Sequence, residues 1–97
     1  MALIQKAISK NPNNAAAYYY RGLIYNDQSK TEDAIQNYRE AIGRQADFKD
    51  ASYGLGVALE TKKDFLGAKE AFEKFVQLSG ATNDEFTKYA RERLAEL

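Results

Sequence analysis

The chain has no cysteine and no histidine, and it has one proline among its 97 residues. Without the first two it offers no disulfide, no thiolate nucleophile, no histidine base and no zinc site of the usual kind. Carboxylates and lysines are present, but the commonest catalytic groups are missing. We therefore expect a protein that is not an enzyme and that uses neither a metal nor a cofactor.

Net charge and long hydrophobic runs are missing as well. Fourteen Lys and Arg residues balance fourteen Asp and Glu residues, so the chain lacks the basic field that nucleic-acid binding usually needs. No apolar run approaches about 18 residues, the length that a transmembrane helix requires. The apolar run of residues 2–4 is too short for a signal-peptide core. We expect no nucleic-acid partner and no membrane insertion, and the composition does not indicate a compartment.

What the chain does contain is an internal repeat. Its two copies, 34 residues apart, are Tyr18, Arg21, Gly22, Tyr25, Ala34 and Tyr38, and then Ser52, Leu55, Gly56, Leu59, Ala68 and Phe72. A fixed period of this length indicates stacked supersecondary units. Glycine inside a helix costs about 1 kcal/mol relative to alanine, yet Gly22 and Gly56 occupy equivalent sites. We infer that no side chain fits there, because the partner helix lies against the backbone.

Apolar residues recur at helical spacing along the whole chain, and no stretch indicates a strand. Six helices are predicted, one before Pro12, three at about 15–28, 32–44 and 49–62, one after Asp64 and one after Thr82. The expected caps are Thr31, Asp47 and Asp64 at helix starts, Ser79 with Gly80 at a helix end, and a capping box of Thr82 with Glu85.

This pattern resembles the tetratricopeptide repeat (TPR) family, whose signature pairs a helix bearing aromatic-x₂-Leu-Gly-x₂-Tyr with one bearing Ala-x₃-Phe and a closing proline. The resemblance covers essentially the whole chain. It implies an all-α fold, a right-handed α-α superhelix forming one domain over residues 1–97. Residues 2–14 are similar to the second helix of a partial repeat, 15–48 and 49–82 to two full repeats, and 83–97 to the capping helix that ends such arrays.

In this family the first helix of each pair lines the concave face, and the resemblance implies the same here. The residues expected there, as partner-binding residues, are Tyr19, Leu23, Asn26, Tyr53, Val57, Glu60, Thr87 and Arg91. Aromatic and aliphatic side chains with a polar rim are typical of a groove for a peptide or a helix. Tyr19 and Tyr53 are the expected anchors, although a tyrosine at such a site can also simply cover an apolar surface.

Some members of the family grip the terminal carboxylate of a peptide with lysine and asparagine on the concave helices. The matching positions here hold Tyr19, Tyr20, Leu23 and Gly54. We therefore do not expect this chain to be a receptor for a carboxylate-ended chaperone tail.

The leading hypothesis is a non-catalytic protein-interaction module, a piece of a larger scaffold or assembly protein, that binds a peptide or helix in the concave groove. The alternative is self-association as a homodimer or swapped array. It is favoured because Leu3, Ile4 and Ile8 of the half repeat expose an apolar face unless that face packs wholly on the next helix. An RNA-binding helical repeat is disfavoured by the zero net charge and by the absence of basic rows on the expected inner face.

Overall fold

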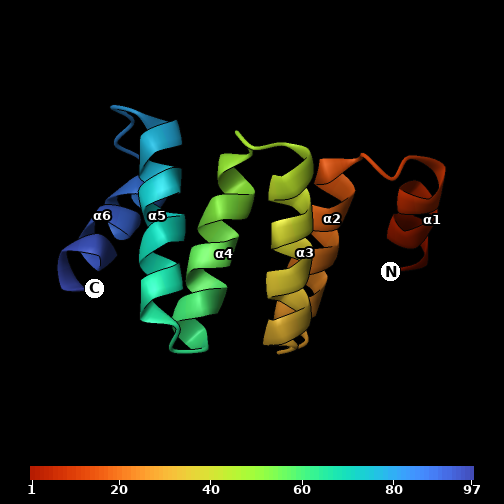
Figure 1. The fold of residues 1–97 in the computed structure, drawn as a ribbon, viewed down its shortest axis with the longest axis horizontal. Coiled ribbons are helices and arrows are strands. Elements are labelled where there is room, and N and C mark those ends of the chain that lie inside the picture. The colour runs from red at the N-terminus through yellow and green to blue at the C-terminus, as the bar shows by residue number, and fades with distance from the viewer.

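The computed structural model describes all 97 residues, which form six helices joined by short turns, without a strand (Figure 1). The helices are α1 (Ala2–Lys10), α2 (Ala15–Asp27), α3 (Thr31–Arg44), α4 (Lys49–Thr61), α5 (Phe65–Ser79) and α6 (Glu85–Glu96). The expected all-α helical-repeat fold is confirmed, while the division into repeats stays a prediction. None of the six helices combines the length and the apolar character needed to cross a membrane.

The helices stand in a row, with α1 at one end and α5 and α6 at the other (Figure 1). Each helix packs chiefly against its neighbour in sequence, most extensively α2 against α3 and α4 against α5, and α2 also touches α4. The molecule is therefore elongated, with extents of 40 × 26 × 20 Å. This nearest-neighbour packing is the property of a solenoid rather than of a closed globule.

Several helix ends are fixed as the sequence predicted. The carboxylate of Asp64 accepts a hydrogen bond from the backbone N–H of Gly67 at 3.0 Å and so caps α5. Gly80 ends α5 with a φ of +64°, in the left-handed region that favours glycine. These caps satisfy backbone groups that the helix itself leaves without partners.

Three expected caps are wrong. Thr31 is already the first helical residue of α3, and α4 begins without a side-chain cap although Asp47 precedes it. The hydroxyl of Thr82 donates to the carbonyl of Ser79 at 2.7 Å and does not cap α6. Asp84 takes that role, because it immediately precedes the helix and its carboxylate accepts from the backbone there.

The ring of Tyr38 in α3 joins three helices. A Cβ atom added to Gly22 of α2 would lie 2.7 Å from Tyr38 Cε1, and one added to Gly54 of α4 would lie 2.9 Å from Tyr38 Cζ. The ring thus fills the space that side chains would need on both neighbouring helices. The expected close approach at Gly22 is confirmed, with an aromatic ring rather than a helix backbone as its neighbour.

The same fit recurs in the next helix pair. Phe72 of α5 is fully buried, and a Cβ atom on Gly56 of α4 would lie 2.8 Å from its Cδ1 atom. The core around these two rings is rich in alanine, with Ala34, Ala41, Ala51, Ala58, Ala68 and Ala90 all buried. Small residues at the crossings let the helices approach closely while two aromatic rings fill the interior.

Alanine at Gly22 and at Gly43 should change stability in opposite directions. At Gly22 the new methyl group collides with Tyr38, so we expect a loss of about 1–3 kcal/mol in the free energy of unfolding. Gly43 is helical, and a Cβ atom added there would meet nothing within 4 Å, so Gly43→Ala should gain about 0.5–1 kcal/mol. Denaturant unfolding of both variants checks this, and equal stabilities would contradict the fit described here.

Candidate functional site

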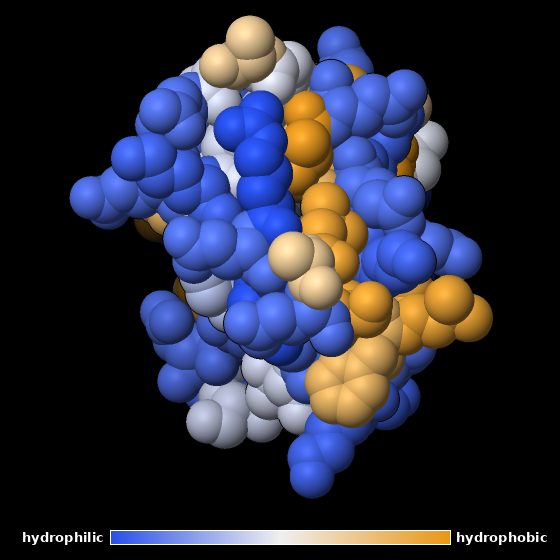
Figure 2. Space-filling model, turned by 90° about the vertical axis from the view of Figure 1, so that its left-hand side faces the viewer, coloured by the Kyte–Doolittle hydropathy of each residue, from blue (hydrophilic) through white to orange (hydrophobic).

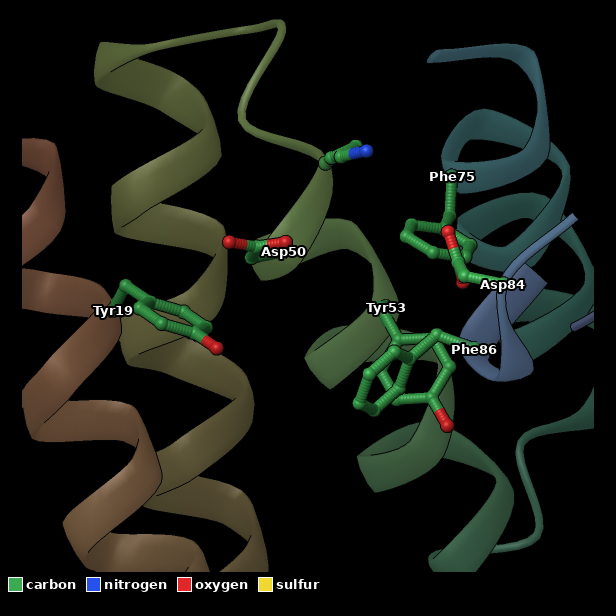
Figure 3. A pocket seen from close by; sticks show the side chains of 7 residues that line it. Tyr19, Asp50, Tyr53, Phe75, Asp84 and Phe86 are labelled. Atoms are coloured by element: carbon green, nitrogen blue, oxygen red, sulfur yellow. The ribbon is translucent and has the colours of Figure 1, made fainter. Parts of the chain in front are cut away.

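Two adjoining hollows, of about 270 and 230 Å³, lie between α2, α4 and α6. Both are lined by Tyr19, Asp50, Tyr53 and Phe86, and together they form the surface that we call the groove. The first hollow adds Lys49, Phe75 and Asp84, and the second adds Leu23, Asn26, Tyr38, Gly54 and Val57. In Figure 3, Tyr19 reaches toward the first hollow from α2, opposite Tyr53 and Phe86.

The structure brings together the three expected residues of α2 and two of the three expected residues of α4, whereas Glu60 lines neither hollow. Tyr19, Leu23 and Asn26 of α2 line the same hollow as Tyr53 and Val57 of α4. They meet because each set lies on one face of its helix at spacings of three or four residues, and because α2 and α4 are in contact. Whether these residues bind a partner stays a prediction.

The two expected anchors also support the core. The ring of Tyr53 lies 5.1–6.2 Å from those of Phe72, Phe75, Phe86 and Tyr89. The ring of Tyr19 lies 5.1 Å from that of Phe48 and 6.0 Å from that of Tyr38. Both tyrosines are half-buried, so each ring packs against the interior with part of its surface and leaves the rest open to the groove.

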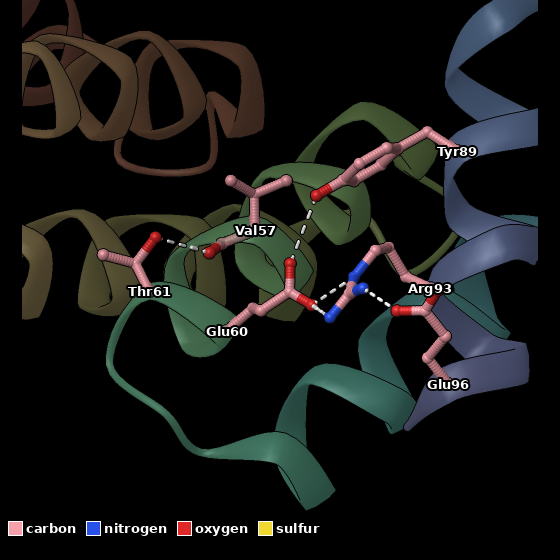
Figure 4. Close-up of polar contacts among 6 residues, drawn as sticks. All are labelled: Val57, Glu60, Thr61, Tyr89, Arg93 and Glu96. Carbon is pink, nitrogen blue, oxygen red and sulfur yellow. Dashed lines mark hydrogen bonds and ion pairs between the residues drawn. The ribbon is translucent and has the colours of Figure 1, made fainter.

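Glu60, another expected groove residue, is engaged inside the molecule (Figure 4). One of its carboxylate oxygens accepts a hydrogen bond from the hydroxyl of Tyr89 at 3.2 Å, and the other pairs with the guanidinium of Arg93. Arg93 also pairs with Glu96. Burial, with Glu60 nearby, raises the pKa of the Tyr89 phenol. This network links α6 to α4. The Glu60 carboxylate, which was expected to contact a partner, is therefore already paired within the chain.

The expected places of Thr87 and Arg91 on the open face are wrong. Thr87 is 0% exposed, and its hydroxyl donates to the carboxylate of Asp84 at 3.2 Å. The guanidinium of Arg91 donates to the backbone carbonyls of Gly80 and Thr82, at 3.0 and 3.2 Å, in the loop that precedes α6. Neither residue lines the groove.

Thr87 and Arg91 lie away from the groove because α6 is rotated about its own axis relative to the orientation that the sequence predicts. The helical spacing of the sequence predicts a stripe of Phe86, Tyr89, Ala90, Arg93, Leu94 and Leu97 on this helix, but Phe86 and Tyr89 are exposed. Thr87 and Ala90 face the core instead, each 0% exposed, because small side chains let α6 approach α5 closely. The larger rings are thereby turned toward the groove.

Sequence reasoning missed several groove residues, among them Lys49 and Phe75, and the most exposed aromatic one is Phe86. Its side chain is 60% exposed, and its ring meets that of Tyr53 edge to face, with centroids 5.4 Å apart. The sequence also contains an alternative stripe of Thr87, Ala90 and Leu94. If that stripe is buried, Phe86 is turned out of the core, and this signal could have identified it. That stripe places small residues at the crossing, as the other helices of the chain do.

Antiparallel helix pairs stand in a row, and a groove runs along one face between α2, α4 and α6. These features define the class of α-helical repeat proteins. Family models described as tetratricopeptide repeat match residues 3–36 and 25–83, the second covering more than half of the chain. The chain belongs to the tetratricopeptide repeat family, whose fold generally mediates protein–protein interaction.

Among solved structures, the TPR domain of Sgt2 from Aspergillus fumigatus superposes with a TM-score of 0.87 at 26% identity, over 98% of this chain and 63% of that one. Among curated proteins, the chain is 27% identical over 70 residues to a protein of Pseudomonas putida named as a probable biofilm formation methyltransferase, WspC. It is 33% identical over 54 residues to human tetratricopeptide repeat protein 13. These matches cover 72% and 56% of this chain but only 16% and 6% of the two proteins.

Asp84 connects the groove to the folding of α6. Its carboxylate accepts a hydrogen bond from the backbone N–H of Thr87 at 2.9 Å, which caps the helix. This hydrogen bond, helped by the hydroxyl of Thr87 and the charge of Lys49, lowers the pKa of the Asp84 carboxyl from its ordinary value of 3.8. The carboxylate therefore stays ionised in the groove at neutral pH.

The lowered pKa predicts an acid-dependent stability difference between the natural chain and Asp84→Asn. Because the folded pKa lies below the unfolded value of 3.8, the charged cap stabilises the fold above that pH. The stabilisation is lost as the pH falls through the lower folded pKa. Melting temperatures by circular dichroism from neutral to strongly acid pH should therefore converge. Asp47→Asn, which removes the same charge at a position that caps no helix, is the control, and a pH-independent difference would contradict the prediction.

Proposed function

We propose that this chain is a non-catalytic protein-interaction module that binds a segment of a partner protein, a peptide or a helix, in the groove. The observation that carries the proposal is the convergence of three partly open aromatic rings, those of Tyr19, Tyr53 and Phe86, on one groove. Monomer surfaces usually show apolar residues singly, and aromatic side chains gathered in a hollow mark an interaction site.

The groove has the two components that such binding requires. The rings, with half-buried Leu23 and Val57 beside them, present apolar surface, and full burial of one such side chain contributes about 1.5–3 kcal/mol. Asn26 and Asp50 are exposed at the same hollow and supply polar groups at its rim. The apolar part supplies affinity and the rim supplies orientation and specificity.

Because the rings of Tyr53 and Tyr19 also support the core, alanine at either site would confuse binding with stability. Val57→Arg is the sharper variant, since it fills the second hollow with a long charged side chain and removes no ring. Gln77→Arg, on the exposed outer side of α5, adds the same charge away from the groove and is the matched control.

Peptides selected on the intact chain from a random displayed library test the proposal. Their affinities, measured by fluorescence anisotropy, should fall about tenfold or more for Val57→Arg, a loss of about 1.4 kcal/mol, and should be unchanged for Gln77→Arg. The proposal fails if no peptide binds, or if the selected peptides bind both variants as tightly as the natural chain.

Self-association is the second candidate, and the two ends of the row favour it. At one end α1 packs against α2 but has no buried residue, and Leu3 is 82% exposed. At the other end Figure 2 shows a hydrophobic strip between hydrophilic surfaces, on the side that α5 and α6 form. Phe65 and Leu66 of α5 are exposed as well. Apolar surface at both ends suits a second copy stacked on either one.

If self-association occurs through α1, then Leu3→Glu should abolish it. We expect sedimentation velocity to show a concentration-dependent dimer for the natural chain and for Gln5→Glu, which adds the same charge to an exposed polar position of α1. Leu3→Glu should sediment as a monomer, because a carboxylate would be buried in an apolar contact. Loss of the dimer in Leu66→Glu as well would indicate head-to-tail stacking. A natural chain that is monomeric at high concentration would rule this candidate out.

A further inference from the structure

We propose that the first hollow of the groove, between Tyr19, Tyr53 and Phe86, receives an arginine side chain of the bound protein segment. This inference rests on the proposed function of the groove and specifies the chemistry of the partner. The occupant is a segment with an arginine flanked by apolar residues, the opposite of a carboxylate-ended tail.

The walls of the hollow suit a flat cation. Aromatic rings from four helices line it, with Tyr19 on one side and Tyr53, Phe75 and Phe86 on the other (Figure 3). A guanidinium placed over the face of an aromatic ring gains roughly 0.5–1 kcal/mol at an exposed site and more when water is excluded. The chain already uses this contact elsewhere, since the guanidinium of Arg44 lies 4.2 Å from the centroid of the Tyr18 ring.

The rim of the hollow is acidic, although the chain as a whole is neutral. Asp50 and Asp84 line it, and neither takes part in any ion pair of the structure. Lys49 is the single basic residue in the lining, and the charge of Lys49 acts on Asp84. Two carboxylates facing one ammonium leave a net negative charge, and Asp50 in particular is uncompensated.

The charge of Asp50 also acts on the neighbouring ring of Tyr19. After burial, which is the larger cause, the Asp50 carboxylate raises the pKa of the Tyr19 phenol. The negative charge of Asp50 therefore acts on the Tyr19 wall of the hollow, which favours a cationic side chain and opposes an acidic one.

The size of the hollow favours one long side chain. Its volume of about 270 Å³ lies below the roughly 300–1,000 Å³ of pockets that hold drug-sized molecules. The adjoining hollow of about 230 Å³ is lined by Leu23 and Val57 and suits an apolar neighbour of the inserted residue. Arginine fits better than lysine, because its planar guanidinium stacks on rings, binds carboxylates with two parallel hydrogen bonds and is less strongly hydrated than an ammonium.

The test uses fluorescent peptide pools with random flanks that differ only in the fixed central residue, which is arginine, citrulline, leucine or glutamate. Citrulline keeps the shape of arginine and removes its charge. We expect the arginine pool to bind about tenfold or more tightly than the citrulline pool and more tightly still than the glutamate pool. We also expect added salt to weaken the arginine pool most.

Variants of the chain test whether Asp50 and Asp84 cause the preference for arginine. Asp50→Asn should reduce the preference for arginine over citrulline, and Asp50→Asn combined with Asp84→Asn should abolish it. Glu73→Gln, the same change of charge on the exposed outer side of α5, should leave it intact. Asparagine at position 84 preserves a helix cap, and melting curves of all variants establish that each is folded at the temperature of the binding assay.

The outcomes separate this inference from the proposed function. If the leucine or glutamate pool binds best and Val57→Arg abolishes its binding, the groove binds a partner but the assignment of arginine is wrong. The assignment is equally wrong if the arginine pool binds best and the Asp50 and Asp84 variants do not change its preference. If no pool binds, or if binding survives Val57→Arg, the proposed function fails and the inference fails with it.

Discussion

The structure depends on the fit of one aromatic ring between two glycines. Tyr38 of α3 lies where side chains would stand on α2 and on α4, and only glycine leaves room for the ring on both helices. A ring held in this way sets the spacing of three consecutive helices at once. Phe72 and Gly56 repeat half of this fit one helix pair later, with a ring against a glycine on one side only. Because the inserted rings come from α3 and α5, they fill one side of the row and leave α2 and α4 beside each other on the other side.

The position of α6 turns that open side into a groove with a third wall. Tyr53 of α4 stacks edge to face with Phe86, and Glu60 of α4 pairs with Arg93. These contacts hold α6 across α4 as well as against α5. The buried stripe of α6 begins at a small residue, Thr87, so the larger ring of Phe86 faces the groove. Asp84 both caps α6 and lines the first hollow, so one carboxylate contributes to the start of the last helix and, with Asp50, to the charge of the groove.

The sequence was sufficient to predict the structure where the internal repeat and the helical spacing indicate the same arrangement. The helix positions, the close approach at Gly22 and the common hollow of Tyr19, Leu23 and Val57 follow from residues spaced three or four apart in two copies of one pattern. It was insufficient for α6, which has no second copy in the chain for comparison. There two stripes overlap at Ala90 and Leu94, one beginning at Phe86 and the other at Thr87, and residue size suggested the wrong one. The close crossing with α5 decides between them, and that is a tertiary contact that hydrophobicity alone does not reveal.

The zero net charge of the chain does not exclude a charged groove, because charge is distributed unevenly over the faces of the molecule. Lys62 pairs with Glu32 and Arg44 with Glu40, both outside the groove, and Arg93 is engaged by Glu60 and Glu96. Asp50 and Asp84 belong to no ion pair, and with Lys49 as the single basic residue of its lining the first hollow keeps a local negative charge in a chain whose total is zero. Aromatic walls alone would accept any apolar segment. Carboxylates that belong to no ion pair beside those walls would add a cost for every acidic segment and a gain for a basic one. The proposed binding groove would thereby discriminate among partners by repulsion as well as by attraction.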